Sequence, residues 1–173
     1  MPHETVTLFF ALLAGALVIG LLAVGLGLVT GRLAGVVGTI EELSLELAAA
    51  VAVVATAGSL YLSEVAGFTP CRLCWVQRGF MYPAAVLLVI ALITRHRLPA
   101  MAAGGLALIG LPVALFHRWE QSAGEVGGLC DAANPCSARW VSHFGFVTIP
   151  TMAAVGFVGV AALTALHLRR RSS

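Results

Sequence analysis

The chain lacks lysine altogether and carries little charge of either sign. Charged residues make up 10% of its 173 positions, whereas an ordinary soluble domain has roughly 25%. All ten basic residues are arginine, and against eight acidic residues they leave a formal charge of +2. This composition excludes an ordinary soluble domain, and so small and scattered a charge excludes nucleic acid as a partner.

Long hydrophobic runs take the place of charge, since 60% of the residues are hydrophobic. The five longest runs without a charged residue are 5–31, 47–63, 79–94, 98–117 and 140–168. A membrane-spanning helix needs about 20 apolar residues, so these runs predict an all-α integral membrane protein with five transmembrane helices. The third run is short, and we expect its helix to start within 75–78. The first is too long for the core of a signal peptide, so we expect it to be retained.

The distribution of arginine predicts the orientation of these helices. If the loop around Arg32, the hairpin with Arg95 and Arg97, and the tail 169–171 are cytoplasmic, six arginines lie inside and four outside, as the positive-inside rule favours. The N-terminus and both cysteine-containing gaps then lie outside, where disulfides persist, and the C-terminus is cytoplasmic. Within the second external gap, 118–147, the pattern over 138–147 predicts a short helix lying in the membrane interface.

Four cysteines form two close pairs, Cys71 with Cys74 and Cys130 with Cys136, each in a polar gap between apolar runs. Three chemistries suit such pairs. Four thiolates can hold a structural zinc ion, two disulfides can staple external loops, or two pairs on one membrane face can exchange a disulfide between them. The wide second pair and an oxidising exterior speak against zinc, and so apolar a bundle has little need of staples, so the relay is the favoured interpretation.

Charge near the first pair supports redox chemistry. Arg72, Arg78 and the start of a helix all favour a thiolate at Cys71 or Cys74. Cys74 and Arg78 are four residues apart, so on a helix they share one face, and an electron acceptor can fit between them. His117 borders the second gap, where an imidazole can shuttle protons near neutral pH or help to bind the acceptor.

Three segments resemble the DsbB/BdbC family of disulfide bond formation proteins, most closely the BdbC branch. They are Pro70-Cys71-Arg72-Leu73-Cys74-Trp75-Val76-Gln77-Arg78 with Phe80, Met81, Tyr82 and Pro83; Phe116-His117-Arg118-Trp119; and Cys136-Ser137-Ala138-Arg139-Trp140 through Phe144-Gly145-Phe146-Val147-Thr148-Ile149-Pro150. The resemblance covers roughly 44–168. It implies a four-helix catalytic bundle in a bacterial plasma membrane, here residues 44–173 with two external cysteine loops. Residues 1–43 would be an additional transmembrane helix and its connector, whose role is open.

The resemblance also implies an activity, which is the reoxidation of a DsbA-like thioredoxin-fold dithiol oxidase with transfer of the electrons to a membrane quinone, menaquinone or ubiquinone. Redox-active disulfides Cys71–Cys74 and Cys130–Cys136 would carry the electrons. Cys130 would form the mixed disulfide with the partner, and Cys136 would exchange with Cys71. Cys74 would be the thiolate facing the quinone, Arg78 would polarise a quinone carbonyl, and Gln77 and His117 would lie beside it. No metal is expected.

Two further interpretations stay open. A vitamin K epoxide reductase-like protein also combines a CxxC, a second cysteine pair and a quinone, but there the CxxC follows the loop cysteines, whereas here it comes first. A non-enzymatic metal-binding membrane protein is the alternative from another functional class.

Overall fold

Five long helices dominate the computed structural model, which describes residues 2–32, 34–124, 130 and 134–170. The helices are α1 (Pro2–Thr30), α2 (Ala34–Glu42), α3 (Ser44–Leu60), which continues as a π-helical turn η1 (Tyr61–Val65), α4 (Arg72–Thr94), α5 (Arg97–Ala123) and α6 (Ile149–Arg170). All but α2 and η1 are long and apolar enough to cross a membrane, α3 being counted together with η1. The prediction of an all-α protein with five spanning helices is therefore confirmed.

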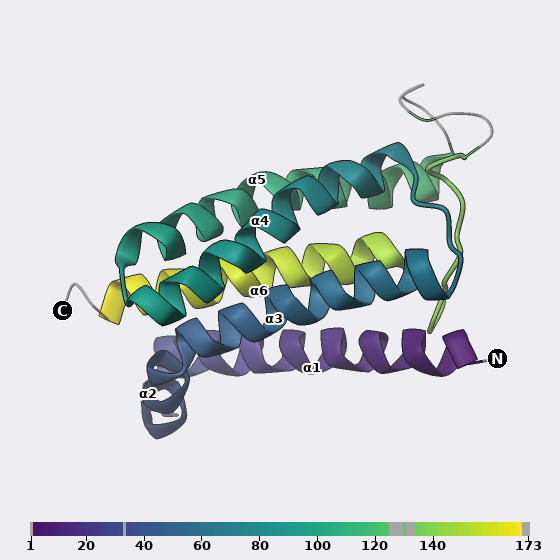
Figure 1. Cartoon of the computed structure of the whole chain (residues 1–173). Helices are drawn as coiled ribbons and strands as arrows, with labels where there is room; N and C mark the ends of the chain where they lie inside the picture. Colours follow the sequence, from purple (N-terminus) through teal and green to yellow (C-terminus); the bar gives the residue numbers. More distant parts are fainter. Residues whose placement is uncertain (1, 33, 125–129, 131–133, 171–173) are drawn as a thin grey trace.

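The long helices run side by side and alternate in direction (Figure 1). The N-terminus, the α3–α4 connection and the α5–α6 connection lie at one end of the bundle, which we call the cysteine end because Cys71 and Cys130 lie in these connections. The α4–α5 hairpin and the C-terminus lie at the opposite end. The two cysteine pairs, far apart in the sequence, are thus brought to one end of the molecule.

Small residues form the contact between the helices. The alanines Ala48, Ala52, Ala84, Ala91, Ala100, Ala103, Ala107 and Ala114 are fully buried. Small side chains let helix backbones approach closely, which is how helices associate when lipid removes the hydrophobic driving force. Where a large ring does enter, a glycine faces it: Phe157 of α6 is fully buried against Gly110 of α5, where a side chain would overlap the ring.

Helix α4 begins earlier than predicted. Its first residue is Arg72 and its N-cap is Cys71, so the prediction of a start within 75–78 is wrong. The cause is local, because the Cys71 sulfur accepts a hydrogen bond from the backbone N–H of Cys74 at 3.4 Å. A sulfur thereby does what an N-cap oxygen usually does for an otherwise unsatisfied N–H.

The short interfacial helix predicted over 138–147 is also wrong. His143 and Val147 instead exchange two backbone hydrogen bonds of 2.9 Å, which closes a tight turn. Phe144 and Gly145 occupy it with φ of 53° and 78°, and two consecutive left-handed residues are incompatible with a right-handed helix. The apolar residues expected on one helix face, Trp140, Val141, Phe144 and Val147, are not presented together, because Trp140 and Phe144 are exposed whereas Val141 is buried.

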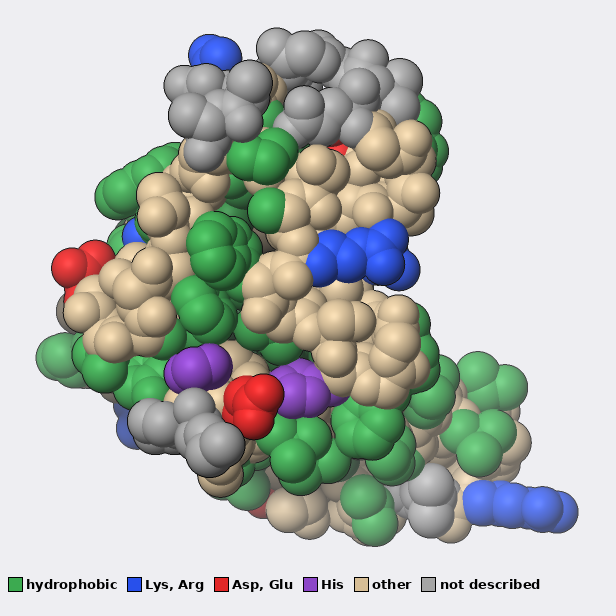
Figure 2. Space-filling model, turned by 90° about the vertical axis from the view of Figure 1, so that its right-hand side faces the viewer, with side chains coloured by type: hydrophobic (Ala, Val, Ile, Leu, Met, Phe, Trp, Pro, Cys, Tyr) green, Lys and Arg blue, Asp and Glu red, His purple; other side chains and the backbone are tan. Residues whose placement is uncertain are grey.

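Figure 2 looks onto the cysteine end, where hydrophobic side chains alternate with histidine, acidic and arginine side chains. Such a mixed surface suits the boundary between lipid and water, where amphipathic and aromatic side chains gather. At the other end, the connector expected between the first two spans forms a helix of its own, α2.

Candidate functional site

The first cysteine pair sits at the N-terminus of α4 as two thiols in contact. The sulfurs of Cys71 and Cys74 are 2.9 Å apart, and both cysteines are free. Cys71 is buried, with 5% of its surface exposed. A sulfur at a helix N-terminus lies in the positive end of the helix dipole, so this position stabilises a thiolate on Cys71.

An imidazole on α5 connects this pair to the second one. The His117 Nε2 lies 3.6 Å from the Cys71 sulfur and 3.2 Å from the backbone oxygen of Cys136. Its Nδ1 lies 2.8 Å from the side-chain nitrogen of Gln77. With the Gln77 amide assigned in this orientation its nitrogen can only donate, so Nδ1 accepts and the proton of a neutral ring is on Nε2. Gln77 thus directs the His117 N–H toward Cys71 and Cys136.

These contacts change the acidity of Cys71, which lies just outside the spanning segment that begins at Arg72. The hydrogen bond from the Cys74 thiol lowers the pKa of the Cys71 thiol below its usual range, and the His117 imidazole lowers it further. Burial opposes this shift but does not cancel it. Cys71 is therefore the acidic thiol when the pair is reduced, whereas the resemblance implies the thiolate at Cys74. Cys71 also packs in one cluster with Cys136 of the second pair.

The second pair forms a disulfide, Cys130–Cys136. Cys136 is almost fully buried and packs with Cys71 and Leu73 in one small cluster, against which Cys74 and Cys130 also pack. Asn134, between the bonded cysteines, donates a 2.9 Å hydrogen bond to the backbone oxygen of Pro70, the residue before Cys71. The Asn134 hydrogen bond and the His117 contact with the Cys136 backbone oxygen thus both hold the second cysteine pair next to the first.

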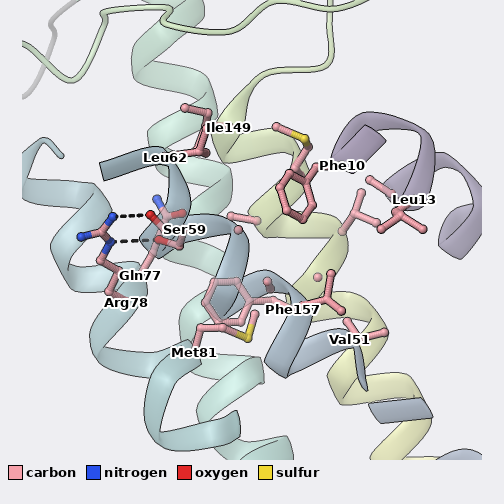
Figure 3. A pocket seen from close by; sticks show the side chains of 18 of the residues that line it. Phe10, Leu13, Val51, Ser59, Leu62, Gln77, Arg78, Met81, Ile149 and Phe157 are labelled. Atoms are coloured by element: carbon pink, nitrogen blue, oxygen red, sulfur yellow. Dashed lines mark hydrogen bonds between the residues drawn. The ribbon is translucent and has the colours of Figure 1, made fainter. Parts of the chain in front are cut away.

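Below Cys74 a cavity of about 340 Å³ runs into the bundle. Its polar lining residues are Thr7, Ser59, Cys74, Gln77, Arg78 and Tyr82. The remaining wall is apolar and comes from α1, α3, η1, α4 and α6. Figure 3 shows Gln77, Arg78 and Ser59 on one side of this space and Phe10 and Leu13 on the other. The cavity is a largely apolar chamber, and its polar side, formed by α3 and α4, carries all the polar lining residues except Thr7 and includes a thiol.

Arg78 is buried on that polar side. Its Nε donates to the Ser59 hydroxyl at 2.9 Å and its Nη2 to the Ser59 backbone oxygen at 2.8 Å (Figure 3). The guanidinium carbon lies 5.0 Å from the Trp75 ring centre and 6.0 Å from that of Tyr82. No ion pair to Arg78 occurs among the described residues, so its charge is held by hydrogen bonds and ring faces alone.

The residues singled out in the sequence fall into two adjoining groups. Cys74, Gln77 and Arg78 line the cavity, as their common helix face predicts. His117 does not line it. Its imidazole lies between the side chains of Gln77 and Cys71. It is therefore placed to act on the thiols and not on a molecule in the cavity.

Two contributors were missed by sequence reasoning. Ser59 accepts the hydrogen bonds of Arg78. In the sequence, its role is indicated only by a hydroxyl side chain within an otherwise apolar helix. Asn134 joins the two loops, and its position between two cysteines gives no indication of a partner more than sixty residues away.

One group of residues in the described part of the chain could hold a metal ion, and it differs from the four-thiolate zinc site that the sequence disfavours. The ligand atoms of Cys71, Cys74 and His117 all lie within 4.8 Å of one another. An all-thiolate zinc site needs four free thiolates, whereas Cys130 and Cys136 are bonded to each other. A metal-binding alternative would therefore use two thiols and one imidazole.

Comparison with known proteins agrees with this arrangement. The family described as disulfide bond formation protein DsbB matches residues 41–167. The chain belongs to the DsbB family. The matched segment contains both cysteine pairs and the residues around His117 and Arg78, and it leaves out α1.

Curated relatives include proteins of Oceanobacillus and Bacillus species. A probable disulfide formation protein of Oceanobacillus iheyensis is 40% identical over 126 residues, which are 69% of this chain and 85% of that protein. A probable disulfide formation protein C 1 of Bacillus anthracis is 36% identical over 133 residues, 76% of this chain and 96% of that protein. Disulfide bond formation protein C of Bacillus subtilis is 38% identical over 116 residues, 62% and 80%. No solved structure matches the chain.

Family membership and the five spans together establish the general activity. This DsbB-family protein is a multi-pass bacterial membrane protein and a thiol oxidoreductase of disulfide bond formation. The family implies redox-active cysteines and a redox partner, and the structure has two cysteine pairs in contact.

The acidity of Cys71 is testable through its hydrogen-bond donors. In protein carrying Cys130→Ser and Cys136→Ser, a further Cys74→Ala change removes a donor to Cys71, whereas Cys74→Ser keeps a hydroxyl there. Because the donor stabilises the thiolate, the Cys71 pKa should be higher in the alanine variant, by about one pH unit, as expected for one hydrogen bond to a charged group. The measurement is thiolate ultraviolet absorbance against pH, with Cys71→Ser as the blank. Identical titration curves for the alanine and serine variants would contradict the role of Cys74 as a hydrogen-bond donor to Cys71.

Proposed function

We propose that this protein is a quinone-linked oxidase that regenerates a DsbA-like thioredoxin-fold dithiol oxidase. The observation that carries the proposal is the contact between the two pairs: Cys71 and Cys136 pack together beside one imidazole, and Cys74 lines an apolar cavity next to a buried arginine. The loop pair can thus exchange with the partner and the α4 pair with a lipophilic acceptor.

The exchange steps balance in electrons and protons. A thiolate of the partner attacks Cys130, which forms a mixed disulfide and releases Cys136 as a thiolate. The second partner thiol resolves the mixed disulfide, so the partner is oxidised and the loop pair holds two electrons and two protons. Cys136 then attacks Cys71 of an oxidised α4 pair and releases Cys74, and Cys130 resolves the Cys71–Cys136 bond. The product is a loop disulfide with a reduced α4 pair, the combination present in this structure.

Quinone fits the cavity by the chemistry of its lining. The walls are largely apolar, as a lipid-soluble molecule requires, and all the polar lining residues except Thr7 come from α3 and α4. A bound quinone would supply the acceptor for two electrons and two protons from Cys71 and Cys74. Menaquinone and ubiquinone both meet this description.

Three side chains have separable roles beside the thiols. A guanidinium has five N–H donors, and two hydrogen bonds to Ser59 leave donors of Arg78 for a carbonyl oxygen in the cavity. Gln77 lines the cavity while it holds the His117 tautomer. His117 is placed to stabilise the Cys71 thiolate and to take or return its proton.

The proposed orientation places the cysteine end on the outer face of the plasma membrane. The opposite end carries five described arginines, Arg32, Arg95, Arg97, Arg169 and Arg170, against four at the cysteine end, Arg72, Arg78, Arg118 and Arg139. Such an excess of arginine favours the cytoplasmic side. The remaining arginine of the tail, Arg171, lies outside the described residues. A partner that oxidises exported proteins would then meet Cys130 directly.

Turnover is the test of this function. Purified protein with a short-tail menaquinone should oxidise a reduced DsbA-like protein over many cycles, because each cycle returns both pairs to disulfides. Serine at any one of Cys71, Cys74, Cys130 or Cys136 should reduce the rate to the background without protein. The assay follows partner thiols and quinone absorbance together.

Two results would contradict the oxidase. Multiple turnover that survives loss of either pair would defeat the relay. Stoichiometric metal in reduced protein, without quinone reduction, would favour the metal-binding alternative at Cys71, Cys74 and His117.

Arg78 has its own prediction. Arg78→Ala should raise the KM for quinone about tenfold, the loss expected for one hydrogen bond from a charged donor. Arg78→Lys should fall between alanine and wild type, since an ammonium keeps the charge without the planar fork. Exchange between the loop pair and the partner, measured in a single turnover without quinone, should not change. Arg97→Ala, at the opposite end, is the matched control. An unchanged KM in Arg78→Ala would remove Arg78 from the quinone site.

A further inference from the structure

Helix α1 forms one wall of the cavity although it lies outside the segment that the DsbB family matches, 41–167. Its lining residues are Thr7, Phe10, Leu13, Ala14 and Leu17. Their spacing of three or four residues places them on one helical face. Figure 3 shows Phe10 and Leu13 across the space from Arg78.

Two glycines of the matched segment receive side chains of this face. A Cβ at Gly58 of α3 would lie 2.8 Å from the Phe10 ring, and one at Gly159 of α6 would lie 2.7 Å from Leu17. Both distances are too short for real carbon contacts, so the absence of a side chain at each glycine makes the close approach possible. The cavity-lining face of α1 therefore packs closely against α3 and α6.

The outer part of α1 is tied to the loops at the cysteine end. The Thr7 hydroxyl and His143 Nε2 lie 3.0 Å apart, and Thr7 is 3% exposed. His3 contacts Phe68 edge-on, and Phe68 stacks on Trp140. These contacts fix the rotation of α1 that directs Phe10 and Leu17 inward. Its other face is bare: Ile19 is 70% exposed and Leu22 67%.

We infer that α1 completes the quinone cavity of this protein, with Phe10 and Leu17 as specificity-determining residues that contact the apolar part of the quinone. The inference rests on the proposed function, which supplies the ligand class. Without α1 the remaining helices would leave the chamber open on the side opposite Arg78. Phe10 provides a flat ring face there, and Leu17 closes the chamber at the depth of Gly159.

The test compares inward and outward positions of the same helix. In the full-length protein, Phe10→Ala and Leu17→Ala remove parts of the wall, and Ile19→Ala removes a similar apolar side chain from the bare face. Binding of a short-tail menaquinone is measured by quenching of tryptophan fluorescence, since Trp75 lies beside Arg78. Quinone reduction with dithiothreitol as electron donor is measured in parallel.

Phe10→Ala should raise the Kd and the KM for the menaquinone about fivefold, a typical loss for an aromatic contact, with kcat retained. Leu17→Ala should act in the same direction, and Ile19→Ala should match wild type. If Phe10→Ala and Leu17→Ala both have the same Kd as Ile19→Ala, the inference about α1 is wrong. Quinone-dependent turnover by the wild-type protein would still support the proposed oxidase function in that case. Wild-type protein that neither binds nor reduces menaquinone or ubiquinone would overturn both.

A double-mutant comparison separates the wall from general stability. Gly159→Ala forces Leu17 to move, although Gly159 does not line the cavity. It should raise the Kd in the wild-type background and have no further effect once Leu17 is alanine. Equal effects in the two backgrounds would show that Leu17 does not transmit the change.

Discussion

The hydrogen bonds around His117 hold the two halves of the site together. One ring nitrogen faces both the Cys71 sulfur and the Cys136 backbone oxygen, and the other is fixed by Gln77. In the described part of the α5–α6 loop, other side-chain hydrogen bonds that hold it in place include Asn134 to Pro70 and the pair that joins Gln121 of α5 with Ala138 and Arg139. Thiol–disulfide exchange requires sulfurs in line and within reach, so the position of His117 sets whether the pairs can react.

The same arrangement gives the two cysteines of α4 different surroundings. Cys71, at the helix cap, faces the imidazole and the loop pair, whereas Cys74, on the first turn, lines the cavity with Arg78. Three residues along a helix are enough to separate a protein-facing thiol from a ligand-facing one. In the proposed relay, the CxxC spacing would connect exchange at the membrane surface with reduction of an acceptor inside the bundle. The additional helix α1 lines the cavity and also contacts the loops at the cysteine end, through Thr7 with His143 and through His3 with Phe68.

Much of this could be predicted from the sequence, because the relevant signals are local. Charge-free runs gave the five spans, and the four-residue step from Cys74 to Arg78 put both on the cavity face. The errors also have local causes: a cysteine took the role of N-cap at Cys71, and left-handed Phe144 and Gly145 made a turn where periodicity indicated a helix. The contacts of Ser59 with Arg78 and of His117 with Cys136 arise only when distant helices pack, so no sequence spacing predicts them.

The most direct measurement of the central claim is the disulfide formed when one cysteine of each pair remains. In protein with Cys74→Ser and Cys130→Ser, the packing of Cys71 and Cys136 in one buried cluster predicts that these two form an intramolecular disulfide, identified by mass spectrometry of the linked peptides. The converse variant, Cys71→Ser with Cys136→Ser, should leave Cys74 and Cys130 as thiols under the same oxidant. Free thiols in the first variant, or equal linkage in the two, would contradict a relay that passes from Cys136 to Cys71.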